Sequence, residues 1–112
     1  MRFNMFIIVY ITHGTELAAK KISDYLLTKK LIACANIFPI TSAYWWKNNI
    51  VKEGEWVSIV KTIPEHWEQL QSEVEAVHPY TTPCIMKFEV SANRAYEAWI
   101  RKEVIPASDQ AG

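Results

Sequence analysis

An apolar run near the N-terminus, Met5–Ile11, is the sequence feature that most constrains how this chain can fold. It is far shorter than the roughly 18 residues that a membrane-spanning helix needs, and it is typical of a buried strand. Alternate residues of a strand point to opposite faces of a sheet, and both sets of side chains are apolar here. We therefore expect a central strand that is covered on both sides.

The periodicity of the remaining chain predicts two main helices, three further strands and a short final helix. Thr15 can cap a helix over residues 16–29, and Pro64 suits the first turn of a second helix that ends at His78-Pro79. The strands are expected at Ala33–Trp46, Ile50–Thr62 and Cys84–Val90, with Lys47-Asn48-Asn49 as the turn of a hairpin and Asn93 as the cap of the last helix.

Two residues predict irregularities within that hairpin. Pro39 is expected to interrupt the second strand, as proline does at an edge position or a bulge. Gly54 is expected to mark a bulge or a bend in the returning strand. The hairpin should therefore be less regular than the first strand.

The order of the elements, β-α-β-β-α-β followed by a helix, predicts an α+β fold of the ferredoxin-like sandwich type. Both main helices are expected on one face of a four-stranded sheet, which leaves the other face open in a single chain. Because the first strand is apolar on both faces, we expect further copies of the chain to cover the open face. Residues 1–112 are predicted to form one domain, with a loose tail at 107–112.

The charge balance and the cysteines limit the classes of partner and compartment. The chain has 12 basic and 12 acidic side chains, so its formal net charge is zero. Binding to nucleic acid or to an anionic membrane needs an excess of basic residues, and neither partner is expected. Cys34 and Cys84 form no disulfide framework, and we interpret both as small buried side chains of a cytoplasmic protein.

No common catalytic motif occurs in the sequence. It has no phosphate-binding glycine-rich loop, no G-x-S-x-G, no H-E-x-x-H and no cysteines at zinc-site spacing. An acylphosphatase-like enzyme of this topology would need an arginine in the first strand–helix loop, which reads Thr12-His13-Gly14-Thr15. The third strand has one aromatic and two acidic side chains, unlike an RNA-recognition surface. We therefore expect a protein without enzymatic activity.

Three histidines are the remaining candidates for chemistry. His13 lies in the first strand–helix turn, and His66 is expected at an exposed position in the first turn of the second helix. His78 follows the second helix, where the helix dipole favours a histidine and predicts a C-terminal cap. The alternative for His78 is a ligand for a metal or an anion, because imidazole is the commonest metal ligand.

An aromatic cluster, Tyr44-Trp45-Trp46, lies near the tip of the expected hairpin. Three large rings at such a tip cannot all be buried within one small domain. We interpret them as part of a subunit interface, where aromatic residues are favoured. The alternative is a platform on which a ligand stacks.

A series of short motifs, taken in order, resembles one family. The motifs are Ala33-Cys34-Ala35-Asn36-Ile37, Thr41-Ser42-x-Tyr44-x-Trp46, Lys61-Thr62, His78-Pro79-Tyr80-x-Thr82-Pro83 and Trp99-Ile100. Over residues 5–104 the chain closely resembles the CutA divalent-cation tolerance proteins. The resemblance implies a ferredoxin-like homotrimer whose long hairpin strands add to the sheets of neighbouring subunits. It also implies a cytoplasmic location in bacteria and a link to copper tolerance, and it establishes no enzymatic activity.

The chain departs from that family at the copper ligands proposed for some members. Ile11 stands where those members have a cysteine, and Val77-His78 stands where they have a His-His pair. His78 thus stays a candidate metal ligand, and Cys84, in place of the family's usual glutamate, is the one soft ligand expected nearby. No cofactor is required, and any binding of copper or another divalent cation is expected to be weak or indirect.

A second interpretation is a trimeric sensor that resembles the PII-like signalling proteins, whose effectors bind in clefts between subunits. Lys61, Tyr80 and Trp46 are the candidates for such a cleft, because polar or aromatic side chains stand there at strand and helix ends. The short turn of the hairpin differs from the long exchangeable loop of those proteins. Both interpretations make further copies of the chain the expected partner.

Overall fold

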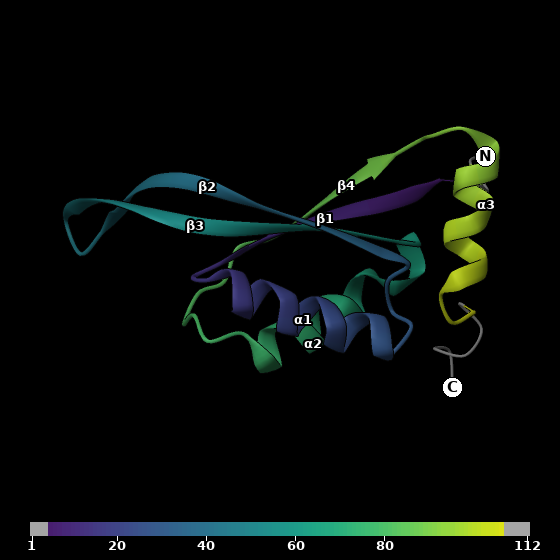
Figure 1. Cartoon of the computed structure of the whole chain (residues 1–112), viewed down its shortest axis with the longest axis horizontal. Coiled ribbons are helices and arrows are strands. Elements are labelled where there is room, and N and C mark those ends of the chain that lie inside the picture. The colour runs from purple at the N-terminus through teal and green to yellow at the C-terminus, as the bar shows by residue number, and fades with distance from the viewer. Residues whose placement is uncertain (1–4, 107–112) are drawn as a thin grey trace.

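The structure is a computed structural model that describes residues 5–106, so the predicted tail at 107–112 lies outside the described residues. The described elements are β1 (Phe6–His13), α1 (Glu16–Thr28), β2 (Cys34–Trp46), β3 (Asn49–Thr62), the 3₁₀ turn η1 (Pro64–His66), α2 (Trp67–Val77), β4 (Ile85–Val90) and α3 (Arg94–Glu103). The strands form one antiparallel sheet in the order β2-β3-β1-β4. Figure 1 shows α1 and α2 together on one face of this sheet and α3 at its end. The predicted ferredoxin-like fold is confirmed.

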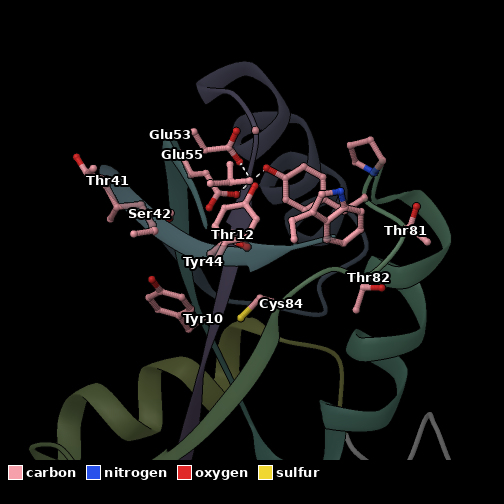
Figure 2. Close-up of a pocket in the computed structure, with 17 residues that line it drawn as sticks. Tyr10, Thr12, Thr41, Ser42, Tyr44, Glu53, Glu55, Thr81, Thr82 and Cys84 are labelled. Carbon is pink, nitrogen blue, oxygen red and sulfur yellow. Dashed lines mark hydrogen bonds between the residues drawn. The ribbon is translucent and has the colours of Figure 1, made fainter. Parts of the chain in front are cut away.

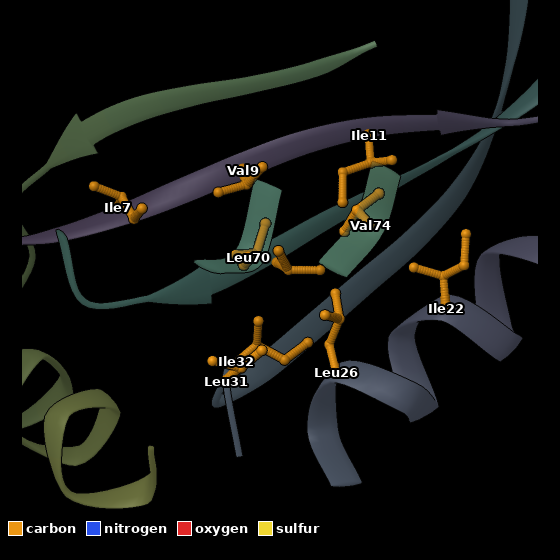
Figure 3. Packing of buried hydrophobic residues seen from close by; sticks show 10 residues of the cluster. Ile7, Val9, Ile11, Ile22, Leu26, Leu31, Ile32, Leu70 and Val74 are labelled. Atoms are coloured by element: carbon orange, nitrogen blue, oxygen red, sulfur yellow. The ribbon is translucent and has the colours of Figure 1, made fainter. Parts of the chain in front are cut away.

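The core lies between the sheet and the two main helices. Ile7, Val9 and Ile11 of β1 are fully buried and pack with Leu26 of α1 and Leu70 of α2 (Figure 3). Fully burying such a side chain contributes about 1.5–3 kcal/mol. The first strand is central, as its apolar composition predicts. The other buried members of this cluster are Ile22, Leu31, Ile32, Val60 and Val74.

A smaller cluster attaches α3 to the end of the sheet. Ile100 and Val104 pack with Phe6 and Ile63, and all four side chains are buried. Asn93 occupies the N-cap position of α3 as predicted, but its side chain makes no capping hydrogen bond.

Local signals place the other element ends where the sequence predicts them. The Thr15 hydroxyl oxygen accepts a hydrogen bond from the Ala18 N–H at 3.0 Å and so caps α1. Lys47 and Asn48 have φ values of 50° and 65°, which gives the two-residue turn that suits the twist of a hairpin. Pro64 stands at the start of η1.

The edge position expected for Pro39 is confirmed, but the interruption expected there and the bulge expected at Gly54 are wrong. The β2–β3 register runs without a break from Cys34 opposite Lys61 to Trp46 opposite Asn49, and it includes both residues. Pro39 fits because β2 is an edge strand, in which half of the N–H groups face away from the ladder.

The expected exposure of His66 is also wrong, because the chain beyond α3 covers it. His66 is fully buried, and its Nε2–H donates to the Ile105 carbonyl oxygen at 2.8 Å. The Ile105 N–H in turn donates to the Lys30 carbonyl oxygen at 2.9 Å. Cys34 and Cys84, expected to be buried, are only half-buried.

The second side of β1 is not covered within one chain. Ile8 and Tyr10 are only half-buried, while Met86 and Phe88 opposite them on β4 are exposed. The expectation of cover on both sides is therefore not met by a single copy. Among the described helices, none is both long and apolar enough to cross a membrane.

Candidate functional site

A groove of about 1140 Å³ lies on the open face of the sheet, where the segment between α2 and β4 passes the end of β1. We name it the open-face groove. Its polar and aromatic side chains come from β1, β2, β3 and that segment, as Figure 2 shows. It is lined by Tyr10, Thr12, Gly14, Ile40, Thr41, Ser42, Ala43, Tyr44, Trp46, Val51, Glu53, Glu55, Pro79, Tyr80, Thr81, Thr82 and Cys84.

The alternation of the strands explains why these side chains share one face. Glu53 and Glu55 are two residues apart on β3, so both point away from the helices. Directly paired residues of an antiparallel sheet lie on the same side, and Glu53 pairs with Ser42 while Glu55 pairs with Ile40. The groove is therefore built mainly from the half of the hairpin that extends beyond β1.

Tyr80 crosses the groove and fixes one of the two carboxylates. Its hydroxyl donates to Oε2 of Glu55 at 2.7 Å, and only 7% of Glu55 is exposed. The ring passes over Gly14, where an added Cβ would lie 3.3 Å from the Tyr80 hydroxyl oxygen. Glycine therefore allows the close approach that brings this segment onto the sheet.

The second carboxylate forms a similar pair nearer the hairpin tip. The Tyr44 hydroxyl donates to Oε1 of Glu53, and this bond raises the pKa of Tyr44 to about 12 (Figure 2). Burial, with the bond to Glu55, raises the pKa of Tyr80 far above its usual value. At neutral pH both phenols thus keep their protons and act as donors to the carboxylates.

Cys84 lines the groove beside these pairs. Burial raises the pKa of its thiol, and the negative charge of Glu55 raises it further. The thiol is therefore protonated at neutral pH, which weakens it both as a nucleophile and as a metal ligand.

His78 lies beneath the groove and positions Tyr80. Its Nδ1 accepts the Tyr80 N–H at 3.1 Å, so the proton is on Nε2, which donates to the Thr12 carbonyl oxygen at 2.7 Å. Both ring nitrogens are engaged, and His78 is not among the groove-lining residues. A metal bound to this imidazole would have to displace one of the two hydrogen bonds. His78 occupies the predicted C-cap position of α2, where its backbone N–H donates to the Val74 carbonyl oxygen at 2.8 Å, while its ring bonds to groups outside the helix.

His13 stacks on His78 and is shielded from water. The two ring centroids are 5.4 Å apart, and Nε2 of the fully buried His13 lies 2.7 Å from the Ser58 hydroxyl. Burial, reinforced by the neighbouring His78, lowers the pKa of His13 to about 4. The imidazole is therefore neutral at physiological pH.

The structure brings some predicted site residues together and separates others. Trp46 and Tyr80 both line the groove within one chain, but Lys61 does not. The Lys61 ammonium lies 3.2 Å from the Tyr96 hydroxyl and 5.5 Å from the centre of its ring. A single cleft containing all three therefore stays a prediction that needs a second subunit.

The candidate metal ligands and interface residues also stay predictions. Cys84 faces the groove and His78 does not, and the part of the chain that the structure describes holds no group of three His, Cys, Asp or Glu side chains able to bind a metal ion. Tyr44, Trp45 and Trp46 are exposed, with Trp45 at 72%. They are thus available to an interface.

Glu53 and Glu55 are the functional candidates that sequence reasoning missed. The sequence E-G-E on a strand is the available signal, because acids two residues apart share a face. The sequence does not predict their pairing with Tyr44 and Tyr80, because Tyr80 and Glu55 are 25 positions apart and only the fold brings them together.

Comparisons with known proteins give one consistent result. The family model described as CutA1 divalent ion tolerance protein matches residues 7–103. Divalent-cation tolerance protein CutA of Thermotoga maritima is 43% identical over 100 residues, covering 88% of this chain and 99% of that protein. Its counterpart in Archaeoglobus fulgidus is 41% identical over 97 residues, covering 86% and 95%.

Solved structures agree with the sequence relatives. The periplasmic divalent cation tolerance protein CutA from Archaeoglobus fulgidus superposes with a TM-score of 0.85 at 39% identity, covering 88% of this chain and 97% of that one. CutA1 from Pyrococcus horikoshii gives a TM-score of 0.85 at 35% identity, with coverage of 88% and 97%.

Proposed function

Since this chain belongs to the CutA1 divalent ion tolerance family, we propose that it supports tolerance of divalent cations without catalysing a reaction. The observation that carries this proposal is the near full-length agreement with relatives named for divalent-cation tolerance. The family match over residues 7–103 includes every described element, apart from Phe6 at the start of β1.

The chemistry of the groove supports a role in binding rather than in catalysis. A nucleophilic mechanism needs an activated group beside a base. The Cys84 thiol and the Tyr80 phenol are both held in their protonated forms, and the two carboxylates accept hydrogen bonds from tyrosines. These groups are arranged to hold a ligand in place.

The working unit that we propose is a homotrimer. Its support is the open face of the sheet, where Met86 and Phe88 are exposed beside the half-buried side of β1. On the same face, Tyr44 and Trp46 of the hairpin are also exposed and line the open-face groove, whereas Trp45 between them points to the opposite face. Several exposed apolar side chains on one face are typical of a protein–protein interface.

We propose that, among divalent cations, copper is the one whose tolerance depends most on this chain. Affinity for a given site generally rises toward Cu²⁺, and His78 and Cys84 are the ligand candidates. Because the His78 ring nitrogens are already engaged, direct Cu²⁺ binding by one chain should be weak. We propose a cytoplasmic location, supported by two cysteines that are free rather than paired.

A growth assay tests the proposed function. The gene is expressed in a bacterium that lacks its own member of the family, and growth is followed at rising copper sulfate. We expect the wild type to restore growth that is lost without it. Equal sensitivity with and without the protein, at matched expression, would contradict the role in tolerance.

Calorimetry tests the proposed metal chemistry separately. Copper titrations of the wild type, His78→Ala and Cys84→Ser should show weak binding that falls in the variants and weakens further in acid, because a protonated imidazole has no lone pair for a metal. Tight copper binding that is equal in all three proteins would place the metal elsewhere.

The open-face groove favours one second candidate, a trimeric sensor for a small effector. Its volume of about 1140 Å³ far exceeds what a bare metal ion needs, and Trp46 and Tyr80 line it. A thermal-shift screen with small charged molecules, compared between wild type and Tyr80→Phe, tests this candidate.

A further inference from the structure

The open-face groove is negatively charged and has no positive side chain in its described lining. Glu53 and Glu55 both face it, and none of its lining residues is Lys, Arg or His. The tyrosine hydroxyls donate to the carboxylates but bring no positive charge. A concave site with charges of one sign attracts the opposite sign.

Glu55 is the strongest reason to expect a cation here. Only 7% of the residue is exposed, and its Oε2 accepts from Tyr80, while Oε1 has no donor among the described residues. No described Lys, Arg or His forms an ion pair with it. Taking a carboxylate out of water without a positive partner is costly, so a cationic group in the groove would relieve that cost.

The walls of the groove favour an organic cation over a metal ion. Tyr44, Trp46 and Tyr80 supply aromatic faces, which attract ammonium groups placed over the ring. Trp46 already attracts one, because the Lys47 ammonium lies 5.9 Å from the centre of its ring. In contrast, the described residues provide no set of three ligands for a metal.

We propose that the open-face groove binds an alkylammonium group, with the charged nitrogen against Glu55 and the apolar stem along the rings of Tyr44 and Trp46. The nitrogen would donate to the free Oε1 of Glu55, and Glu53 would add a second negative charge. The threonine and serine hydroxyls of the rim are further acceptors for a polar substituent. The site needs neither a bound metal nor a role in metal tolerance.

Two sources can supply this group. One is a small free amine, and the other is a lysine side chain of a second copy of the chain that enters the groove on assembly. Both sources place an ammonium group against Glu55. A free amine requires the groove to be open to solution, whereas a lysine from a second copy would already fill it.

Calorimetric titration with butylammonium chloride, at ionic strength held constant with sodium chloride, tests the first source. We expect wild-type protein to bind the probe and Glu55→Gln to bind it at least about tenfold more weakly. Glu89→Gln is the matched control, because Glu89 is an exposed carboxylate outside the groove, and it should bind as the wild type does. Glu53→Gln removes an exposed groove charge with little risk to folding and should weaken binding roughly threefold.

Zero-length crosslinking tests the second source on the same proteins. A carbodiimide joins a carboxylate to an amine only where the two are in contact. If a neighbouring lysine fills the groove, peptide mass spectrometry will find an intermolecular Glu55–lysine amide in wild type and in Glu89→Gln, and the wild type will give no heat with butylammonium. Either binding that depends on Glu55 or this crosslink supports the proposal. Neither binding nor crosslink, or butylammonium binding that is equal in wild type and Glu55→Gln, overturns it.

Discussion

The two faces of the sheet differ in how far one chain completes them. The helix-facing side is closed, with Ile7, Val9 and Ile11 fully buried under α1 and α2. The open side leaves Met86, Phe88, Tyr44 and Trp46 exposed, and it carries the groove with its two carboxylates. The difference shows that one chain uses one side of the sheet to form its core and leaves the other side accessible.

The largest expected effect is on the closed side. Leu26→Ala leaves a cavity beneath β1, because Leu26 is fully buried, and should lower the free energy of unfolding by about 2–5 kcal/mol. Leu17→Ala is the same change on an exposed part of α1 and should cost no more than about 0.5 kcal/mol. Urea unfolding at one fixed protein concentration measures both, and similar losses would contradict the claim that burial under β1 stabilises the closed side.

Acid should weaken the closed side through His13. Its pKa is about 4 in the folded chain and 6.5 in the reference state, so the unfolded chain binds more protons between these values. The free energy of unfolding should therefore fall as the pH drops, by about 2 kcal/mol between pH 6.5 and 5.

Unfolding curves at a series of pH values for the wild type and His13→Asn test this assignment. The variant should lose most of the pH dependence in that range, whatever its absolute stability. An unchanged slope would assign the acid sensitivity to other groups.

A smaller effect is expected where the two sides meet, at Tyr80. Tyr80→Phe removes the only hydrogen bond to the buried Glu55 carboxylate among the described residues, and should lower the free energy of unfolding by about 1 kcal/mol. Tyr44→Phe removes a similar hydrogen bond to the exposed Glu53 and should lower the free energy of unfolding by less. Equal stability of Tyr80→Phe and the wild type in urea would show that the Tyr80–Glu55 pair is not a structural link.

The smallest effect on the fold itself is expected at the hairpin tip. Trp45 is 72% exposed, so Trp45→Ala should leave the far-ultraviolet circular dichroism unchanged. The same variant should raise the concentration needed for assembly about tenfold or more, since large aromatic residues are common interface hot spots. Sedimentation over a dilution series measures this, and assembly identical to the wild type would place the interface elsewhere.

Most of the fold could be predicted from local signals. The cap at Thr15, the turn at Lys47 and Asn48 and the start at Pro64 each depend on residues that are close in sequence. His66 was misjudged because its cover comes from Ile105, which only the packing of α3 brings near. Gly54 fits an unbroken strand, so glycine alone does not specify a bulge.

The candidate site was less predictable for the same reason. Strand alternation places Glu53 and Glu55 on one face, but Tyr80 reaches Glu55 only because Gly14 leaves room beside the end of β1. The engagement of both His78 nitrogens likewise depends on Thr12, which is 66 positions away. Contacts of this kind follow from tertiary packing and leave no periodic signal in the sequence.

The mass of the wild-type protein in solution tests most directly the claim that further copies complete the open side of the sheet. Light scattering coupled to size-exclusion chromatography, at micromolar concentration and without added metal, gives this mass. We expect a single species of three times the 13.0 kDa of one chain. A stable species of 13.0 kDa would contradict it, because the exposed apolar face would then belong to the finished molecule.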